Sequence, residues 1–157
     1  MKVTLICVGK TDEKYIEEGI AKYVKRLVHY IKFNIVVIPD IKNSKNLSQD
    51  QQKEKEGELI LKHVENPDWL MLLDEKGKQY TSVEFSKLLD KNMVSNIQHL
   101  VLVVGGPYGF SDAVYQRSNG LLSLSKMTFS HQMIRLFFVE QLYRAFSIMR
   151  GEPYHHE

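Results

Sequence analysis

Short runs of apolar residues alternate along this chain with longer segments in which apolar residues recur every three or four positions. The runs are rich in β-branched and large aliphatic residues, which predicts buried strands, and the periodic segments predict amphipathic helices between them. Strands are expected at residues 2–9, 31–39, 68–74, 97–106 and 119–125, and helices at residues 12–30, 51–64, 81–90, 111–118 and 131–151. Strands that alternate with helices predict an α/β fold, a parallel sheet flanked by helices.

Local signals indicate where some of these helices begin. Asp12 precedes the first helix and is expected to cap it. Thr81 and Glu84 are spaced as a capping box, in which each side chain accepts a hydrogen bond from the other residue's amide. Thr128 or Ser130 is expected to satisfy free amides at the start of the last helix. Residues 40–50 are polar and are expected to form a surface loop.

The last predicted helix is unusually apolar. Twelve of the 20 residues from 131 to 150 are apolar, and they cover more than one face of a helix. A helix that is apolar nearly all round must be buried on more than one side. In a chain of only 157 residues, a second copy of the chain is the best candidate to bury the remaining side of this helix. The sequence therefore predicts a homodimer packed through this helix, with Phe138 at the interface. A central helix within the monomer is the alternative.

Composition narrows the class of protein. A length of 157 residues suits one domain that spans residues 1–157. No apolar run is long enough for a membrane helix, and residues 1–10 resemble a first strand rather than a signal peptide. Cys7 is the only cysteine, so no internal disulfide can form, and a cytoplasmic location is expected. A net charge of +2 permits an RNA partner without requiring one.

Several common ligand motifs are absent from the sequence. The stretch "VGKT" at residues 8–11 is not a P-loop, because Thr4 stands where that motif needs a glycine. The dinucleotide pattern G-x-G-x-x-G does not follow any predicted strand. There is no cysteine pair, and the six histidines show no metal-ligand spacing, so no metal site is predicted.

Three segments at the carboxyl ends of strands remain as candidates for a binding site. They are residues 72–78, 103–110 and 123–131. Ligands of open parallel sheets bind outside these strand ends. The middle segment, "VVGGPYGF", contains three glycines, whose backbone no side chain covers. Such a backbone can form a tight connection, or it can let a ligand or another piece of chain approach closely. Together the three segments could bind an adenosine-like ligand.

Four stretches carry a family resemblance. They are "MKVTLICVGK" at the start, "VVGGPYGF", "LSLSKMTFSHQMIR" at residues 122–135, and "EQLYRAFSIMRGEPYHHE" at the end. These stretches resemble the ribosomal large subunit methyltransferase H family, whose members are SPOUT-class enzymes that methylate N3 of a pseudouridine in 23S rRNA. The resemblance covers the whole chain.

The resemblance implies several properties that periodicity could not show. It implies a C-terminal trefoil knot around S-adenosylmethionine as the cofactor. It also implies a 23S rRNA substrate, in the helix 69 loop of the large ribosomal subunit, and action on assembled ribosomes, for which the small net charge provides a further argument. The implied cofactor-binding residues are Leu73, Gly105, Leu124, Ser125, Lys126, Met127, Thr128 and Phe129.

The end of the chain offers residues for catalysis. The imide N3 must lose a proton on methylation, and His155 is a candidate base. Tyr154 could stack on or hydrogen-bond a nucleobase, and Arg144 could hold negative charge or a phosphate. The alternatives are a frayed terminus and, for Arg144, a salt bridge across the dimer interface to Glu140.

Two interpretations from other functional classes stay open. A nucleotide-binding α/β hydrolase would need a catalytic carboxylate at Asp74, Glu75 or Asp112. A non-catalytic dimer that binds ribosomes would need no reactive group at all.

Overall fold

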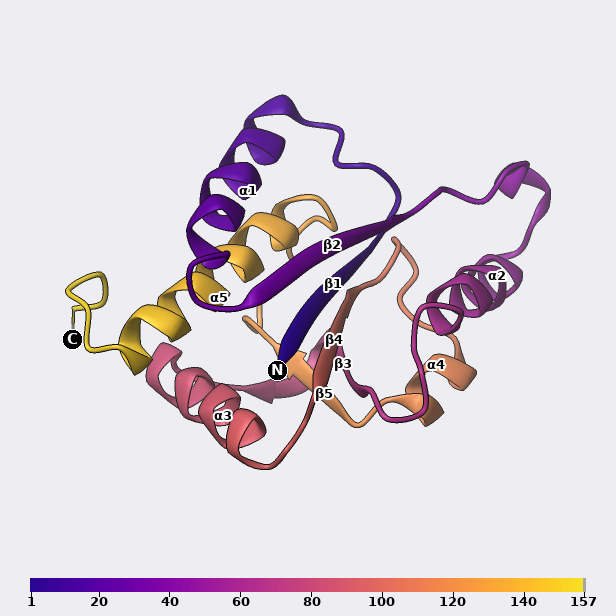
Figure 1. The fold of residues 1–157 in the computed structure, drawn as a ribbon. Helices are drawn as coiled ribbons and strands as arrows, with labels where there is room; N and C mark the ends of the chain where they lie inside the picture. Colours follow the sequence, from indigo (N-terminus) through magenta and orange to yellow (C-terminus); the bar gives the residue numbers. More distant parts are fainter. Residues whose placement is uncertain (157) are drawn as a thin grey trace.

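A parallel sheet of five strands forms the centre of the computed structural model, which describes residues 1–156 (Figure 1). The strands lie in the order β2-β1-β4-β3-β5, and every neighbouring pair is parallel. The predicted α/β class with a parallel sheet is confirmed, and the trefoil knot stays a prediction. The elements are β1 (Lys2–Val8), α1 (Lys14–Leu27), β2 (Lys32–Ile38), the 3-10 turn η1 (Ser44–Asn46), α2 (Gln49–Leu61), β3 (Trp69–Gln79), α3 (Ser82–Val94), β4 (His99–Val104), α4 (Asp112–Arg117), β5 (Gly120–Ser123) and α5 (Met133–Met149).

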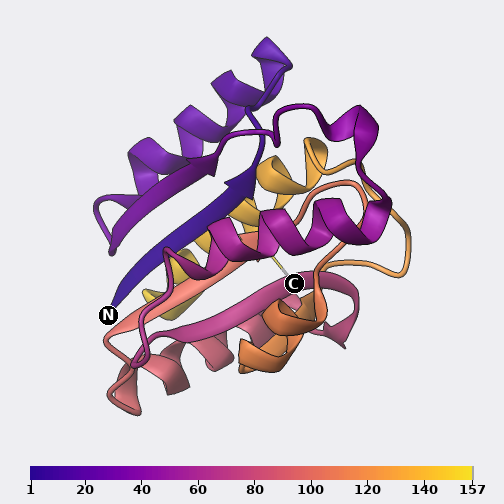
Figure 2. The ribbon, with the colours of Figure 1, turned by 90° about the vertical axis from the view of Figure 1, so that its right-hand side faces the viewer.

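Helices cover both faces of this sheet (Figures 1 and 2). Helices α1, α3 and α5 pack on one face, and α2 and α4 pack on the other. Successive side chains of a strand point to opposite faces. In β1, Val3, Leu5 and Cys7 therefore enter the first core, while Ile6 and Val8 enter the second. Cover on both faces explains why the central strands are continuously apolar.

The helix starts follow the predicted signal at Thr81 and depart from the prediction at Asp12 and in the segment before α2. The capping box of Thr81 and Glu84 is confirmed, with amide-to-side-chain distances of 2.8 and 3.2 Å. Asp12 as a cap is wrong, because α1 begins at Lys14 and the Asp12 amide donates to the Gln132 side chain at 2.9 Å. Helix α2 starts inside the segment expected to be a loop, where Ser48 forms its capping box.

Strand β3 runs longer than its apolar run predicts. It continues to Gln79 and pairs with β5 on both sides of a bulge, so that Leu73 and Lys78 both lie opposite Leu122. Gly77 makes this possible, because a Cβ there would lie only 2.6 Å from the backbone of β5. The polar residues beyond the predicted end of this strand at residue 74 are therefore held within the sheet.

Other parts of the same chain cover most of the apolar surface of helix α5. Phe138 is fully buried and packs edge-on against Phe85 with ring centroids 6.3 Å apart, so its predicted place at a dimer interface is wrong. The neighbouring Phe137 is 42% exposed and is the aromatic residue that α5 presents to the outside. None of the helices in residues 1–156 has the length and apolar character needed to cross a membrane.

A buried arginine ties α5 to the sheet. Arg135 is 1% exposed, and its guanidinium donates to the carbonyl oxygens of Val8 at 2.7 Å and Gly9 at 2.9 Å. It also donates to the Thr11 hydroxyl at 3.1 Å. A buried cation needs such partners, and these bonds fix the start of α5 against the carboxyl end of β1.

Candidate functional site

The three segments singled out from the sequence meet around one cavity at the carboxyl ends of the strands. The cavity has a volume of about 670 Å³, which is within the range of small-molecule sites. Its walls come from the β3 bulge, the turn after β4 and the loop between β5 and α5. Residues outside the three segments also line it: Gln49, Tyr115, Leu122 and Ile134.

The glycine turn after β4 has a bare backbone for two reasons. Gly109 adopts a φ of +82°, which favours glycine, and its amide closes the turn by donating to the Gly106 carbonyl at 3.2 Å. A Cβ on Gly105 would lie 3.0 Å from the Phe110 ring, closer than ordinary packing allows. The turn therefore folds tightly on its own chain while its other side lines the cavity.

The loop between β5 and α5 is held by short-range hydrogen bonds. The Ser125 hydroxyl accepts from the Met127 amide, and the Ser130 hydroxyl accepts from the Met133 amide, both at 3.0 Å. The second contact confirms Ser130 as a residue that satisfies a free amide at the start of α5. The Thr128 hydroxyl donates to the Glu75 carboxylate at 3.2 Å and so joins this loop to the β3 bulge.

Acidic residues beside the cavity are engaged with their neighbours. The Tyr115 hydroxyl and the Lys76 amide both donate to the carboxylate of Asp74. Burial, together with the bond to Asp74, raises the pKa of Tyr115. Tyr115 therefore remains a neutral donor, and its contact anchors α4 to the β3 bulge.

The cavity fits the cofactor residues that the family resemblance implies. Leu73, Gly105 and five residues of the 124–129 segment line it, while Lys126 is exposed and does not. Apolar side chains and glycine residues both line the cavity, a combination suited to an adenosine-type ligand. The cofactor roles of these eight residues stay predictions.

The proposed catalytic residues form a second cluster, at the far end of α5. The Arg144 guanidinium donates to Glu140 at 2.7 Å and lies 3.3 Å from Nδ1 of His155. The Tyr154 hydroxyl also donates to Glu140, at 2.8 Å, and Arg144 lies over the Tyr154 ring at 4.6 Å. The structure thus brings Arg144, Tyr154 and His155 together, and it adds Glu140, which sequence reasoning considered only as a partner across an interface. That cross-interface pairing is wrong, because the pair forms within one chain.

Protonation in this cluster is set by its contacts. Burial, assisted by hydrogen bonds with Tyr23 and Glu140, raises the pKa of Tyr154. Burial opposes the charge on Arg144, but the hydrogen bond and the negative charge of Glu140 outweigh it and raise the pKa of Arg144. Tyr154 is therefore a neutral donor and Arg144 a fixed cation.

Within one chain the cavity and this cluster lie apart. Ile134 lines the cavity near the start of α5, and Arg144 follows ten residues later, which corresponds to about 15 Å along a helix axis. Figure 1 shows the residues that follow α5 at the end of this helix that is remote from the 124–131 loop. One chain therefore presents two separate halves of a possible site.

Comparison with known proteins identifies the family. Residues 1–155 match the family model described as "Predicted SPOUT methyltransferase". The chain belongs to this family. It is 62% identical over its full length to the whole of a protein from Parabacteroides distasonis named "Ribosomal RNA large subunit methyltransferase H". Proteins of the same name from Flavobacterium johnsoniae and Bacteroides fragilis are 59% and 54% identical, again over the full length of both chains.

Family membership also bears on the hydrolase interpretation. A methyltransferase fold needs no catalytic carboxylate beside the cavity, and Asp74 and Glu75 are hydrogen-bonded to Tyr115 and Thr128. These bonds leave the two carboxylates in structural roles that join the walls of the cavity. The SPOUT family assignment therefore favours a methyltransferase over a hydrolase.

Proposed function

We propose that this chain is a methyltransferase of the large ribosomal subunit that uses S-adenosylmethionine to methylate N3 of a pseudouridine in 23S rRNA, in the loop of helix 69. The observation that carries the proposal is the cavity at the carboxyl ends of the strands. Seven of the eight cofactor residues implied by the resemblance line it. The relatives' names, at 54 to 62% identity over the full chain, support an rRNA substrate of the large subunit.

The cavity residues would hold and orient the cofactor. Leu73, Leu124 and Phe129 supply apolar contact area, and the turn at Gly105 supplies backbone groups that no side chain shields. When bound, S-adenosylmethionine supplies a methyl group activated by a positively charged sulfur. Much of the rate of such a transfer comes from holding donor and acceptor in line, so the rigidity of these walls matters.

The tail cluster would prepare the acceptor. For N3 to take up the methyl group that the bound cofactor would supply, the N3 proton would have to leave. His155 is the proposed acceptor of that proton. Arg144 would stabilise the negative charge that develops on the base. Tyr154, kept neutral and with its hydroxyl proton donated to Glu140, would stack on the base or accept a hydrogen bond from it.

A homodimer would join the two halves of the site. The residues of α5 that are not fully buried form one stripe, in which Ile134 and Phe137 lie at one end and Arg144 and Ile148 at the other. A symmetric pair of antiparallel α5 helices would place Arg144 of the partner subunit beside Phe137, close to the cavity. Each site would then combine the cofactor cavity of one protomer with the tail of the other.

Exposed apolar side chains mark the part of the surface that such a dimer would cover. Phe129 and Phe137 are 37% and 42% exposed, and their ring centroids lie 5.0 Å apart. Phe137→Glu should give a folded monomer by light scattering. Phe138→Glu should instead abolish the fold, because its charge would be buried in the core. A wild-type protein that is monomeric at micromolar concentration would overturn the dimer.

Methyl transfer to ribosomes tests the function directly. Ribosomes from a strain that lacks the modification should accept a labelled methyl group at one pseudouridine, whereas protein-free 23S rRNA should accept little, because a chain with a net charge of +2 has limited means of holding free RNA. Absence of transfer to any ribosomal substrate, with S-adenosylmethionine bound, would refute the enzymatic role. Because the substrate is ribosomal, we expect the protein to act in the cytoplasm.

A further inference from the structure

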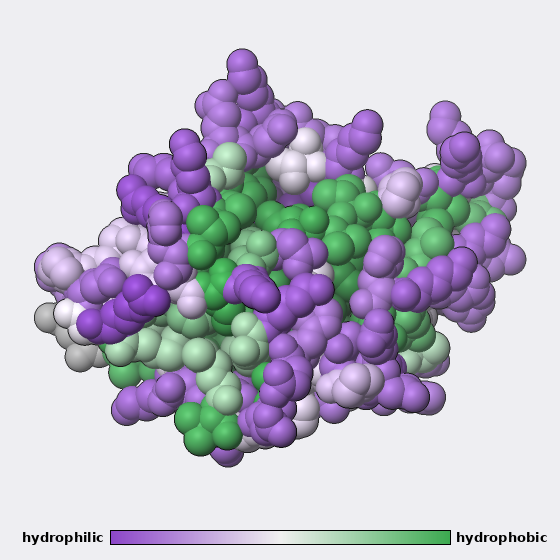
Figure 3. Space-filling model, in the orientation of Figure 1, coloured by the Kyte–Doolittle hydropathy of each residue, from purple (hydrophilic) through white to green (hydrophobic). Residues whose placement is uncertain are grey.

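The second half of α1 and the residues after it form a surface rich in basic side chains. From residue 19 to residue 39 the sequence contains no Asp or Glu. Lys22, Lys25 and His29 are exposed on this segment, and Arg26 is partly exposed. No ion pair joins these cations to a carboxylate anywhere in residues 1–156. Figure 3 shows hydrophilic side chains covering the outer side of α1, at the upper left of the molecule.

The nearest acidic residues are committed elsewhere. Glu18, one turn before Lys22, pairs with Lys14 at 3.9 Å. The carboxylate of Glu152 accepts a hydrogen bond from the Tyr30 hydroxyl. The positive charge of this surface is therefore only partly offset by its neighbours, although the net charge of the whole chain is only +2.

Aromatic rings hold two arginines of this surface in place. The guanidinium of Arg150 lies 4.4 Å from the centroid of the Tyr30 ring and donates to the His29 carbonyl at 3.3 Å. Arg26 lies 5.7 Å from the centroid of the Tyr23 ring. Arginines ordered on aromatic faces lose less conformational entropy when they bind a phosphate.

This basic surface adjoins the proposed catalytic cluster. The hydroxyl of Tyr154 lies 3.5 Å from that of Tyr23 on α1, so the tail packs directly against the helix that carries the cations. We propose that the surface formed by Lys22, Lys25, Arg26, His29 and Arg150 binds the phosphate backbone of the rRNA next to the nucleotide that is methylated. This inference rests on the proposed rRNA methyltransferase function.

Phosphate contacts of this kind position RNA without reading its sequence. A strand that crosses the α1 surface would be guided toward the tail, which would then meet the target base. Because bound phosphates release counterions, each Lys–phosphate contact adds about 0.7 to 0.9 to the slope of log affinity against log salt. The surface should therefore determine ribosome affinity and its salt dependence, and it should not affect the rate of the chemical step.

Charge reversal tests the proposal. In the Lys22→Glu/Lys25→Glu variant, KM for ribosomes should rise about tenfold or more with kcat nearly unchanged, since the contacts are made equally before and during reaction. In the milder Lys22→Gln/Lys25→Gln variant the salt slope should fall by about 1.5. Affinity for S-adenosylmethionine, measured by calorimetry, should equal that of the wild type in both.

A matched control comes from α3. Lys87 and Lys91 are equally exposed, but Glu84 and Asp90 alternate with them along the helix, so their charge is offset. Lys87→Glu/Lys91→Glu should leave KM and the salt slope unchanged.

Three outcomes would overturn the assignment of this surface. They are an unchanged KM in Lys22→Glu/Lys25→Glu, an equal effect in the α3 control, and loss of the dimer mass in the α1 variant, which would mark the face as an interface between copies. A wild type that fails to methylate ribosomes would instead refute the function itself, so the two failures are distinguishable.

Discussion

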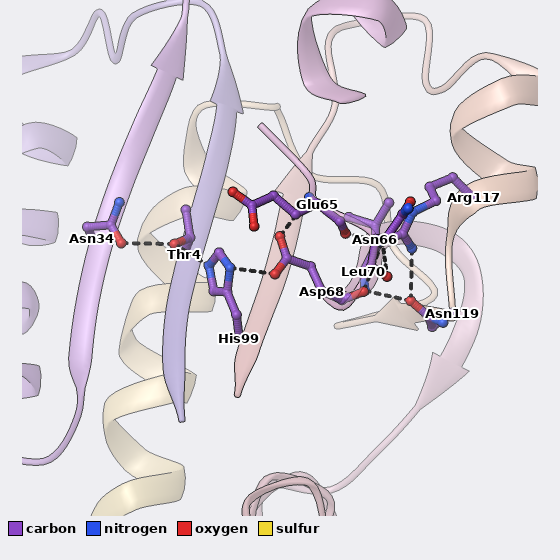
Figure 4. Close-up of polar contacts among 9 residues, drawn as sticks. All are labelled: Thr4, Asn34, Glu65, Asn66, Asp68, Leu70, His99, Arg117 and Asn119. Atoms are coloured by element: carbon purple, nitrogen blue, oxygen red, sulfur yellow. Dashed lines mark hydrogen bonds and ion pairs between the residues drawn. The ribbon is translucent and has the colours of Figure 1, made fainter. Parts of the chain in front are cut away.

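The two ends of the sheet carry similar kinds of residues and use them in opposite ways. At the amino end, polar side chains satisfy one another (Figure 4). The Thr4 hydroxyl donates to Asn34 at 2.9 Å, and Nε2 of His99 lies 2.8 Å from the same hydroxyl. Nδ1 of His99 lies 2.9 Å from the carboxylate of Asp68, which also accepts from the Glu65 amide. A hydroxyl, an imidazole and a carboxylate are thus in the order found in a catalytic triad.

Burial shows why this arrangement is structural. Thr4 is 5% exposed and Asp68 is 6% exposed, so no substrate carbonyl can reach the hydroxyl. Beside them, Arg117 donates to the carbonyl oxygens of Glu65 and Asp68 at 2.7 and 3.0 Å (Figure 4). The network closes the turn before β3 and joins it to β1, β4 and α4.

At the carboxyl end the buried bonds of Arg135 close only the end of β1. There the strands open onto the cavity, and its glycine turn presents backbone rather than side chains. The comparison teaches that residue types in catalytic order are weaker evidence for a site than exposed and convergent groups. Chemistry is therefore expected at the carboxyl end of the sheet, where the tail of the partner protomer would join the cavity. Five predictions test this division.

The largest effect is expected from removing the tail. Deletion of residues 154–157 should lower methyl transfer to ribosomes by a factor of about 10² or more, the scale for loss of a positioned acid–base group. Affinity for S-adenosylmethionine should remain, because the tail lies at the far end of α5 from the cavity. Arg144→Ala should behave likewise. A truncated protein that methylates ribosomes at the normal rate would remove the tail from the mechanism.

Mixing these two variants shows whether the site is shared. If cavity and tail come from different protomers but Arg144 and His155 act from the same tail, as their contact in one chain indicates, a mixed dimer should have no intact tail and stay inactive. Mixing the truncated protein with a Gly105→Val protein should instead restore one working site of two. Recovery in the first mixture would contradict the tail cluster seen in the structure.

A smaller but specific loss is expected from Gly105→Val. The new side chain would press on the Phe110 ring, 3.0 Å from the position of its Cβ, and shift the turn into the cavity. Calorimetry should show affinity for S-adenosylmethionine lowered about tenfold or more, on the scale of a misplaced binding group, while circular dichroism stays native. Gly120→Ala is the matched control, because its Cβ would meet only a Met71 methyl at 3.8 Å. Unchanged affinity in Gly105→Val would separate the glycine turn from the cofactor site.

At the amino end a substitution should change stability and leave function intact. Asp68→Ala leaves His99 and the Glu65 amide without their acceptor, which should lower the free energy of unfolding by about 1 to 3 kcal/mol. Urea unfolding measures this loss. Asp68→Asn keeps an acceptor oxygen and should lose less. A fall in kcat in the folded Asp68→Ala protein would contradict the contrast between the two ends.

The smallest effect is expected at Glu56, under the glycine turn. Its carboxylate is buried, its Oε1 has no hydrogen-bond partner, and a Cβ on Gly106 would lie 2.7 Å from Oε2. Burial raises the pKa of Glu56 above its ordinary value, with a further contribution from the charge of Asp40. The folded state therefore holds this proton more tightly than the unfolded chain, and stability falls as pH rises from the ordinary glutamate pKa through the raised one.

Glu56→Gln should remove this loss of stability with rising pH. The variant should be more stable than the wild type by about 1 kcal/mol at pH 7 and equal to it near pH 4, because a buried amide avoids the cost of an unpaired charge. Thermal unfolding across this pH range measures the difference. Equal pH dependence in the two proteins would show that Glu56 does not carry the effect.

Much of the fold followed from the sequence. Apolar runs located all five strands, and continuous apolarity in β4 required helices on both faces of the sheet. The capping box at Thr81 fixed the start of α3, because its bonds involve residues only three apart. The three segments that line the cavity were also identifiable, since parallel strands place their carboxyl ends at one edge.

Long-range contacts decided the rest. Asp12 is adjacent to α1 in the sequence, yet Gln132 of the distant α5 segment takes its amide. Phe137 and Phe138 are the same residue type at adjacent positions. Only the packing of α5 against α3 shows which of them is buried. Local patterns carry no information about such choices, because the competing partners lie more than a hundred residues apart or on another helix.

The sequence by itself determined the elements, the strand-end segments and the family. Tertiary structure decided that Thr4, His99 and Asp68 form a closed support, and that Arg144, Tyr154 and His155 gather around Glu140 at a distance from the cavity. The physical reason is that strand and helix propensities depend on neighbouring residues, whereas burial and hydrogen-bond partners depend on which distant elements the sheet brings together.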